Sequence, residues 1–168
     1  MRLKYAAPLL TVVLLLFAGC MSSDPLLFSS TLPDGGKLYY LPVTPWKAGG
    51  DLGLAEIRLD ITCRTSGDQQ GTVNISFFGR KDLPGEITAL VLGCDGFEYP
   101  LHDTEMLLER PEQLELRLTA AIPADALKRI SPGENIYLAF SLDGRALQSP
   151  APKEFYIYAR QLDAALGD

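Results

Sequence analysis

The sequence predicts a mainly β protein, an antiparallel β-sandwich or partly open barrel with a short crossover helix and a C-terminal helix. Three observations predict this fold class. Apolar and polar residues alternate with a period of two along several segments, Asp-Gly dipeptides separate apolar runs, and only two segments have helical character. Residues 37–168 are long enough to form a single β-rich domain with one hydrophobic core.

Residues 55–64 form the clearest predicted strand. Their strict alternation places one face in the core, with Ala55, Ile57, Leu59, Ile61 and Cys63 pointing inward. A second alternation follows a polar, Gly-containing loop and has Val73, Ile75 and Phe77 on its apolar side. We therefore expect the two strands to be antiparallel neighbours.

Further strands are expected on both sides of this pair. Residues 87–92 are apolar on both faces, which predicts a strand covered on both sides, and Asp95-Gly96 then predicts a tight turn before residues 97–101. Alternation also predicts strands around 114–118 and 136–142, the second followed by Asp143-Gly144. Residues 37–43 are a further candidate strand, and residues 106–109 receive no assignment.

Two segments depart from the β pattern. Residues 123–130 begin with Pro123 and stop before Pro132-Gly133, so they predict a short helix that crosses between strands. In the tail, Ser149 is a candidate helix cap and Gly167 a candidate stop. Helical spacing relates the apolar residues Phe155, Tyr158, Ala159, Leu162 and Leu166. The alternative for residues 155–158 is a last strand.

The first 19 residues have the order of an export signal. Arg2 and Lys4 precede an apolar run over residues 5–19, which is shorter than the roughly 20 residues that a membrane-spanning helix needs. The run ends in Leu16-Phe17-Ala18-Gly19-Cys20, which resembles the lipobox of bacterial lipoproteins, although Phe17 departs from the leucine usual at that position. The resemblance covers only about the first 20 residues.

The resemblance implies that residues 1–19 are a lipoprotein signal peptide and that Cys20 carries the lipid. In that family the cysteine thiol receives a diacylglyceryl group and the new amino terminus a fatty acid such as palmitate. The chain would then be attached to a membrane of the cell envelope. Met21 is not acidic, which in a Gram-negative bacterium favours the outer membrane. The alternatives are an ordinary signal peptide cut nearby and a retained apolar anchor, and both still export the domain.

Residues 20–36 would connect the lipid to the domain. Ser, Asp, Pro and Gly are frequent there, which predicts a flexible tether. Removal of the signal with Arg2 and Lys4 lowers the basic count from 15 to 13 against 21 acidic residues, a net charge of −8. So acidic a chain repels phosphate backbones, and nucleic acid is not an expected partner.

Two cysteines remain after lipidation. Cys63 and Cys94 form an even pair in an exported chain, so the sequence predicts a disulfide between them. The alternative is two buried thiols that behave as small apolar side chains. Neither belongs to a Cys-x-x-Cys pair, so redox catalysis and zinc binding have no support.

Few residues suggest catalysis or a cofactor. His102 is the only histidine and is followed by Asp103, but there is no Gly-x-Ser-x-Gly motif, and a polar loop histidine is the favoured interpretation. Asp103 and Glu105 are a candidate acid–base pair. In a chain with 21 acidic residues such pairs also arise by chance, and this is the favoured interpretation. Phosphate-binding glycine motifs and the calcium-loop spacing are absent from the sequence. No cofactor, metal or catalytic residue is therefore predicted.

The most suggestive binding segment runs from Tyr39 to Trp46. Tyr39, Tyr40 and Trp46 lie among prolines, and Tyr and Trp are frequent anchors of interfaces. The alternative is that these rings cover one end of the sandwich.

Three functions are consistent with this chain. The first is a noncatalytic, lipid-anchored envelope module that binds another envelope protein or supports assembly. The second is a lipoprotein that binds a small molecule or saccharide, with a pocket near Trp46 or inside the sandwich. The third is an unrecognised envelope hydrolase, which needs a cleft where His102 meets acidic residues.

Overall fold

Two antiparallel sheets make up most of the protein, as the computed structural model of residues 27–48, 53–65 and 70–167 shows. The larger sheet contains β1 (Phe28–Thr31), β2 (Lys37–Trp46), β3 (Leu54–Arg64), β4 (Gln70–Gly79), β8 (Glu115–Pro123) and β7 (Glu105–Arg110), in that spatial order. The smaller sheet contains β10 (Arg145–Pro150), β9 (Tyr137–Leu142), β5 (Ile87–Cys94) and β6 (Phe97–Pro100), also in that order. The predicted mainly β sandwich is confirmed.

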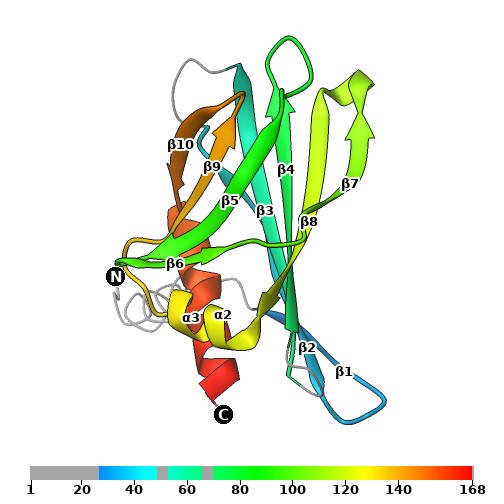
Figure 1. Ribbon diagram of the computed structural model, residues 1–168. Helices are drawn as coiled ribbons and strands as arrows, with labels where there is room; N and C mark the ends of the chain where they lie inside the picture. Colours follow the sequence, from blue (N-terminus) through cyan, green and yellow to red (C-terminus); the bar gives the residue numbers. More distant parts are fainter. Residues whose placement is uncertain (1–26, 49–52, 66–69, 168) are drawn as a thin grey trace, which may run out of the picture.

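The helices close one end of the sandwich. Figure 1 shows β5, β9 and β10 in front of the six-stranded sheet, with α2 (Ala124–Ile130) and α3 (Lys153–Gly167) side by side at the lower end. The helices contact each other, α3 contacts β2, and α2 contacts β4 and β8. A short 3-10 helix, η1 (Pro111–Gln113), joins β7 to β8 at the opposite end. The larger sheet therefore has one face covered by the second sheet and the helices.

The inward face of β3 is largely as predicted. Ile57, Leu59, Ile61 and Cys63 are buried, whereas Ala55 is exposed and Leu54 is buried in its place. The reason is a shift of register between Leu54 and Glu56 in the pairing of β3 with β4, which moves the alternation by one residue.

The predicted β3–β4 pair is confirmed. Asp60 lies opposite Asn74, and Val73, Ile75 and Phe77 are all buried on the inner face of β4. The ring of Phe77 meets that of Phe140 on β9 edge to face, with 5.1 Å between the ring centroids. This contact joins the two sheets through the core.

Both Asp-Gly dipeptides form the predicted turns. Asp95 and Gly96 have φ values of 44° and 83° and connect β5 to β6, while Asp143 and Gly144, at 49° and 77°, connect β9 to β10. Two consecutive positive φ values match the twist of a two-residue hairpin, and Asp-Gly tolerates them.

The crossover helix is confirmed as α2, in which Ala124, Ala126, Leu127 and Ile130 face the core. The C-terminal helix is also confirmed, but its predicted cap is wrong. Ser149 lies in β10, where its hydroxyl donates a 2.7 Å hydrogen bond to the Lys47 carbonyl oxygen, and the helix begins at Lys153.

Three further details differ from the predictions. Residues 28–31 of the expected tether form strand β1, which pairs with β2, and the unassigned residues 106–109 lie in β7. In β5, Thr88 and Ala89 are exposed, so this strand is not covered along both faces. The predicted signal peptide and Cys20 lie outside the described residues.

Candidate functional site

The predicted aromatic surface is mostly core. Trp46 is 1% exposed and Tyr39 8%, while Tyr40 is 39% exposed. The reason is the alternation of β2, which turns Tyr39 and Leu41 inward and Tyr40 outward. The three aromatic side chains therefore do not form one surface.

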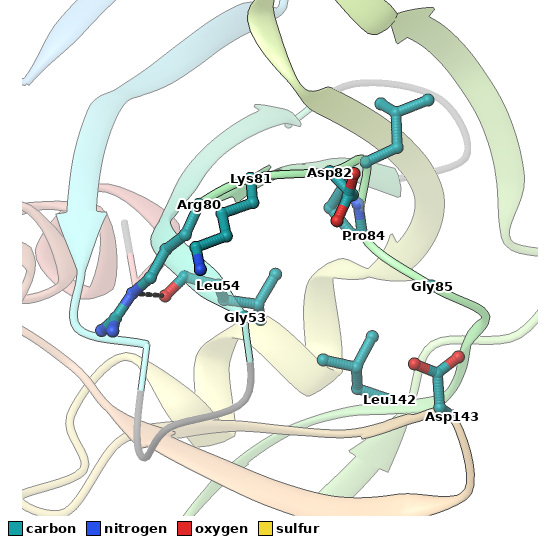
Figure 2. A pocket seen from close by; sticks show the side chains of 10 residues that line it. Gly53, Leu54, Arg80, Lys81, Asp82, Pro84, Gly85, Leu142 and Asp143 are labelled. Atoms are coloured by element: carbon teal, nitrogen blue, oxygen red, sulfur yellow. Dashed lines mark hydrogen bonds between the residues drawn. The ribbon is translucent and has the colours of Figure 1, made fainter.

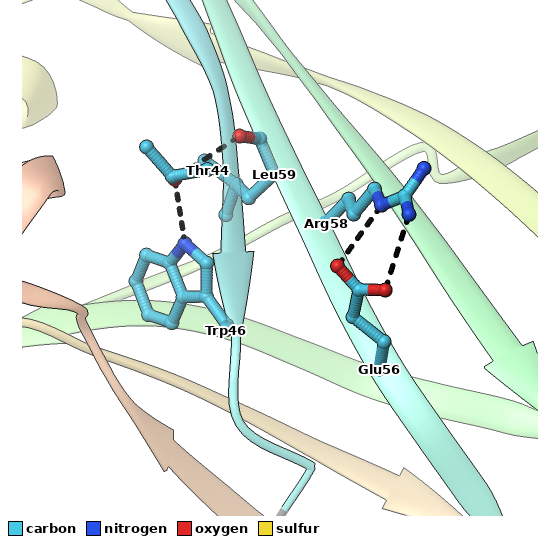
Figure 3. Close-up of polar contacts among 5 residues, drawn as sticks. All are labelled: Thr44, Trp46, Glu56, Arg58 and Leu59. Atoms are coloured by element: carbon cyan, nitrogen blue, oxygen red, sulfur yellow. Dashed lines mark hydrogen bonds and ion pairs between the residues drawn. The ribbon is translucent and has the colours of Figure 1, made fainter.

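A specific set of contacts holds Trp46 in the core (Figure 3). Its indole nitrogen Nε1 donates a 3.0 Å hydrogen bond to Thr44 Oγ1, and that hydroxyl donates to the Leu59 carbonyl oxygen at 3.4 Å. Phe155 of α3 meets the Trp46 ring edge to face, with 5.1 Å between the centroids. The indole fixes α3 against β2, and it is not available to stack on a saccharide.

Cys63 and Cys94 are buried free thiols in different sheets, on β3 and β5. Cys94 Sγ donates to the Arg129 carbonyl oxygen at 3.4 Å, and Cys63 Sγ to that of Arg64 at 3.9 Å. Burial raises the pKa of both thiols, which suppresses the reactive thiolate. Both cysteines are free thiols in this structure, and the disulfide between them stays a prediction.

The candidate acid–base residues lie on the surface. His102, Asp103 and Glu105 are all exposed, and the His102 ring contacts that of Tyr99 with 6.3 Å between the centroids. Asp103 has a φ of 51°, typical of a turn residue. The geometry fits the polar loop histidine favoured by the sequence.

The outer face of the larger sheet is a network of charges. Asp60 accepts hydrogen bonds from Asn74 Nδ2 at 2.8 Å and Arg117 at 2.9 Å, so it links β3, β4 and β8. Arg58 binds Glu56 through two bonds of 3.0 and 3.1 Å, visible in Figure 3. Arg117 Nε is buried and has no hydrogen-bond partner among the described residues, and these charged side chains include no nucleophile poised beside a base.

The pocket shown in Figure 2 has a volume of about 380 Å³ and lies where the loop after β4 meets the β9–β10 turn. Arg80 Nε donates a 2.9 Å hydrogen bond to the Leu54 carbonyl oxygen, and the Asp143 carboxylate accepts one of 2.9 Å from the Glu86 amide. Both charged side chains thus stabilise the junction of loops. Lys81 and Asp82 add one charge of each sign to the lining. The pocket selects no particular ligand charge.

The edge strand β7 carries two strongly exposed apolar side chains, Met106 and Leu107. Met106 is 61% exposed and Leu107 57%, and within the described part of the chain β7 pairs with β8 alone. A register shift between Met106 and Leu108 forms a bulge at Leu107.

A groove of about 280 Å³ adjoins β7, between the edges of the two sheets. Apolar residues from both sheets and from the connecting loop dominate its lining: Leu83, Pro84, Ile87, Met106, Leu116 and Leu118. Glu86 and Glu109 stand at the same groove. We define the β7 edge site as Met106, Leu107 and this groove.

Sequence analysis missed the β7 edge site. Met106, Leu107 and Leu108 are three consecutive apolar residues, so they show no alternation by which to recognise a strand. The one available signal was that an apolar triplet stands between glutamates in an otherwise polar segment.

Among the described residues, no helix combines the length and apolar character needed to cross a bilayer. Across the same residues, His, Cys, Asp and Glu side chains form no cluster suited to a metal ion. No family model, curated protein or solved structure matches this chain. The geometry of its own residues therefore carries the functional argument.

Proposed function

We propose that this chain is a noncatalytic lipoprotein of the cell envelope that binds another envelope protein at its β7 edge site. The anchor is supported by the cationic start, the apolar run and Gly19-Cys20, and Met21 favours the outer membrane of a Gram-negative bacterium. Binding at β7 is supported by one observation above the others, the exposure of Met106 and Leu107 on an edge strand beside an apolar groove.

An extended segment is the partner structure that suits this site. The outer edge of β7 presents backbone N–H and C=O groups to any strand that pairs with it. Alternate side chains of an added strand point to the same side, so they can enter the groove beneath Met106. Backbone pairing supplies affinity in this binding mode, and the groove supplies selectivity.

The charge of β7 adds a preference for a basic partner. Glu105 and Glu109 are exposed, whereas Arg110 is engaged by the buried carboxylate of Glu115 at 3.5 Å. Two copies of β7 paired with each other would bring these glutamates together, which opposes self-association. A segment that alternates apolar residues with Lys or Arg meets both the groove and the acidic edge.

Photocrosslinking in the native envelope tests this function. A photoreactive residue at Leu107 should give one dominant protein adduct, whereas the same residue at Gln148, on the exposed edge strand β10, should not. Met106→Lys should abolish the Leu107 adduct without lowering the thermal midpoint, because Met106 is already exposed. The same adducts at both positions, or none at Leu107, would refute binding at the β7 edge.

A further inference from the structure

We infer that the outer face of the β1–β2 hairpin rests on the lipid surface to which Cys20 is anchored. This inference depends on the proposed lipid anchor and adds an orientation to it. The contact surface, called the hairpin patch below, consists of Phe28, Leu38, Tyr40 and Val43.

The hairpin patch is a group of exposed or half-buried apolar side chains on a sheet face whose middle carries the polar residues Asp60, Asn74 and Arg117. Phe28 is 67% exposed and lies directly opposite Tyr40, 39% exposed, in the pairing of β1 with β2. Side chains of directly opposite residues project from the same face. Leu38, two residues before Tyr40, shares this outer face, and Val43, 53% exposed, follows in the irregular part of β2.

The neighbouring strands show why this patch needs a separate explanation. Beyond β2, the same face carries Asp60, which accepts hydrogen bonds from Asn74 and Arg117. These polar groups suit water, whereas the hairpin patch leaves two aromatic rings and two aliphatic side chains uncovered or half covered. An exposed group of apolar side chains on one face is typical of a contact surface.

The short tether indicates that the surface in contact with the hairpin patch is the membrane. Only six residues lie between Cys20 and Leu27, so the seven Cα–Cα steps limit that span to about 25 Å when fully extended. The Leu27 amide donates a 2.6 Å hydrogen bond to Gln161 Oε1 of α3, so the described chain starts at a fixed point of the domain. Phe28 is the next residue. The lipid anchor therefore keeps the hairpin patch within reach of the membrane, and contact with the bilayer depends on the patch itself.

The short distance between the anchor and the hairpin patch compensates for the weak membrane affinity of so small a surface. Four side chains would bind a bilayer weakly on their own, but a short tether raises the effective concentration of the surface to the order of millimolar. Tyr is well suited to such a contact, because its ring enters the interface while its hydroxyl stays in water. The patch itself contains no carboxylate, and Lys37 adjoins it.

The resulting orientation agrees with the placement of charge. β1 and β7 are opposite edges of the six-stranded sheet, and Figure 1 shows the β1–β2 hairpin at the lower end and β7 at the upper right. Glu105 and Glu109 would thus point away from anionic headgroups. The β7 edge site would face the aqueous compartment, where a partner can reach it.

Fluorescence quenching by nitroxide lipid tests the contact on the acylated protein in phosphatidylethanolamine–phosphatidylglycerol vesicles. An environment-sensitive dye is placed on Ser30→Cys, beside the patch, or on Glu112→Cys, in η1 at the far end. Buried Cys63 and Cys94 stay unlabelled under native conditions. We expect strong quenching at position 30 and little at position 112.

Matched substitutions assign the quenching to the patch. Phe28→Ser together with Tyr40→Ser should reduce the signal at position 30 to that at 112, whereas Leu107→Ser, an equivalent change on β7, should leave it intact. All three positions are exposed, so the fold should tolerate these changes, and circular dichroism checks this.

The possible results distinguish a failure of the proposed lipid contact from a failure of the proposed lipid anchor. Two results on acylated protein would refute the lipid contact of the hairpin patch without refuting the lipid anchor. One is equal quenching at positions 30 and 112, and the other is quenching at position 30 that the Phe28 and Tyr40 substitutions do not change. Intact mass without acyl groups on Cys20 would overturn both. Labels at position 30 that quench one another in detergent, with no response to nitroxide lipid, would show that the patch pairs with a second copy and would overturn the lipid contact.

Discussion

The side chain of Cys63 illustrates how far a single residue can be placed from sequence. Alternation along residues 55–64 predicts an inward Cys63, and this thiol is 0% exposed on β3. Alternation does not say which strand of the opposite sheet lies across from it. The predicted partner Cys94 is on β5, and its thiol donates to the backbone carbonyl of Arg129 in α2.

Alkylation distinguishes the two thiols of the structure from the predicted disulfide. We expect Cys63 and Cys94 of envelope-derived protein to resist alkylation while folded, because burial shields them and raises the pKa of each thiol. After denaturation without reductant, both should be alkylated. Intact mass counts the modifications, and denatured protein that takes up none without reductant would establish the disulfide.

The exposure of three aromatic residues could not be predicted from the sequence: Tyr39, Tyr40 and Trp46. The sequence identifies these residues as aromatic and close together. Their exposure, however, depends on which side chains of β2 face inward and on which element covers that face. Pairing with β3 directs Tyr39 inward, and α3, more than 100 residues later in the chain, covers Trp46. Local sequence contains no information about that helix.

The helix α3 covers the inner face of β2 at the end of the sandwich. Phe155 is 2% exposed and is the α3 residue that meets Trp46. Phe155→Ala should therefore lower the free energy of unfolding by about 3–5 kcal/mol, as large truncations in a core do. Urea denaturation measures the loss.

Glu154→Ala is the control for this prediction. Glu154 is exposed in the first turn of the same helix, so its replacement should change the free energy of unfolding by less than about 0.5 kcal/mol. Equal losses in the two variants would show that α3 is not docked through Phe155.

Elements with a clear local pattern were predicted, and those that depend on pairing were not. β3, β4 and α2 follow from alternation or from proline-bounded helical spacing. β1 is the four-residue segment Phe28–Thr31, β7 contains an apolar triplet, and β10 contains the serine assigned as a cap. Each of these three lies at the edge of a sheet, where a neighbouring strand stabilises a segment that has no strand pattern of its own.

For the whole molecule, composition and periodicity were enough to predict a β-sandwich with two helices, but not the order of its strands. The chain places β8 between β4 and β7, and β1 outside β2, so that β7 and β1 are the two edges of the larger sheet where the proposed surfaces lie. The β7 edge site and the hairpin patch each combine side chains from segments that the sequence left unassigned or assigned to the tether. Neither could be assembled before the sheet order was known.

The proposed lipid anchor on Cys20 would orient the whole molecule, since both proposed surfaces take their direction from it. Intact-mass analysis of protein extracted from membranes tests it directly, with Cys20→Ser as the matched variant. We predict a mature chain that begins at residue 20 and carries a diacylglyceryl group and a fatty acid, and a Cys20→Ser chain that has neither and keeps residues 1–19. A membrane-extracted wild-type chain that lacks acyl groups, or a Cys20→Ser chain processed in the same way as wild type, would show that Cys20 carries no lipid anchor.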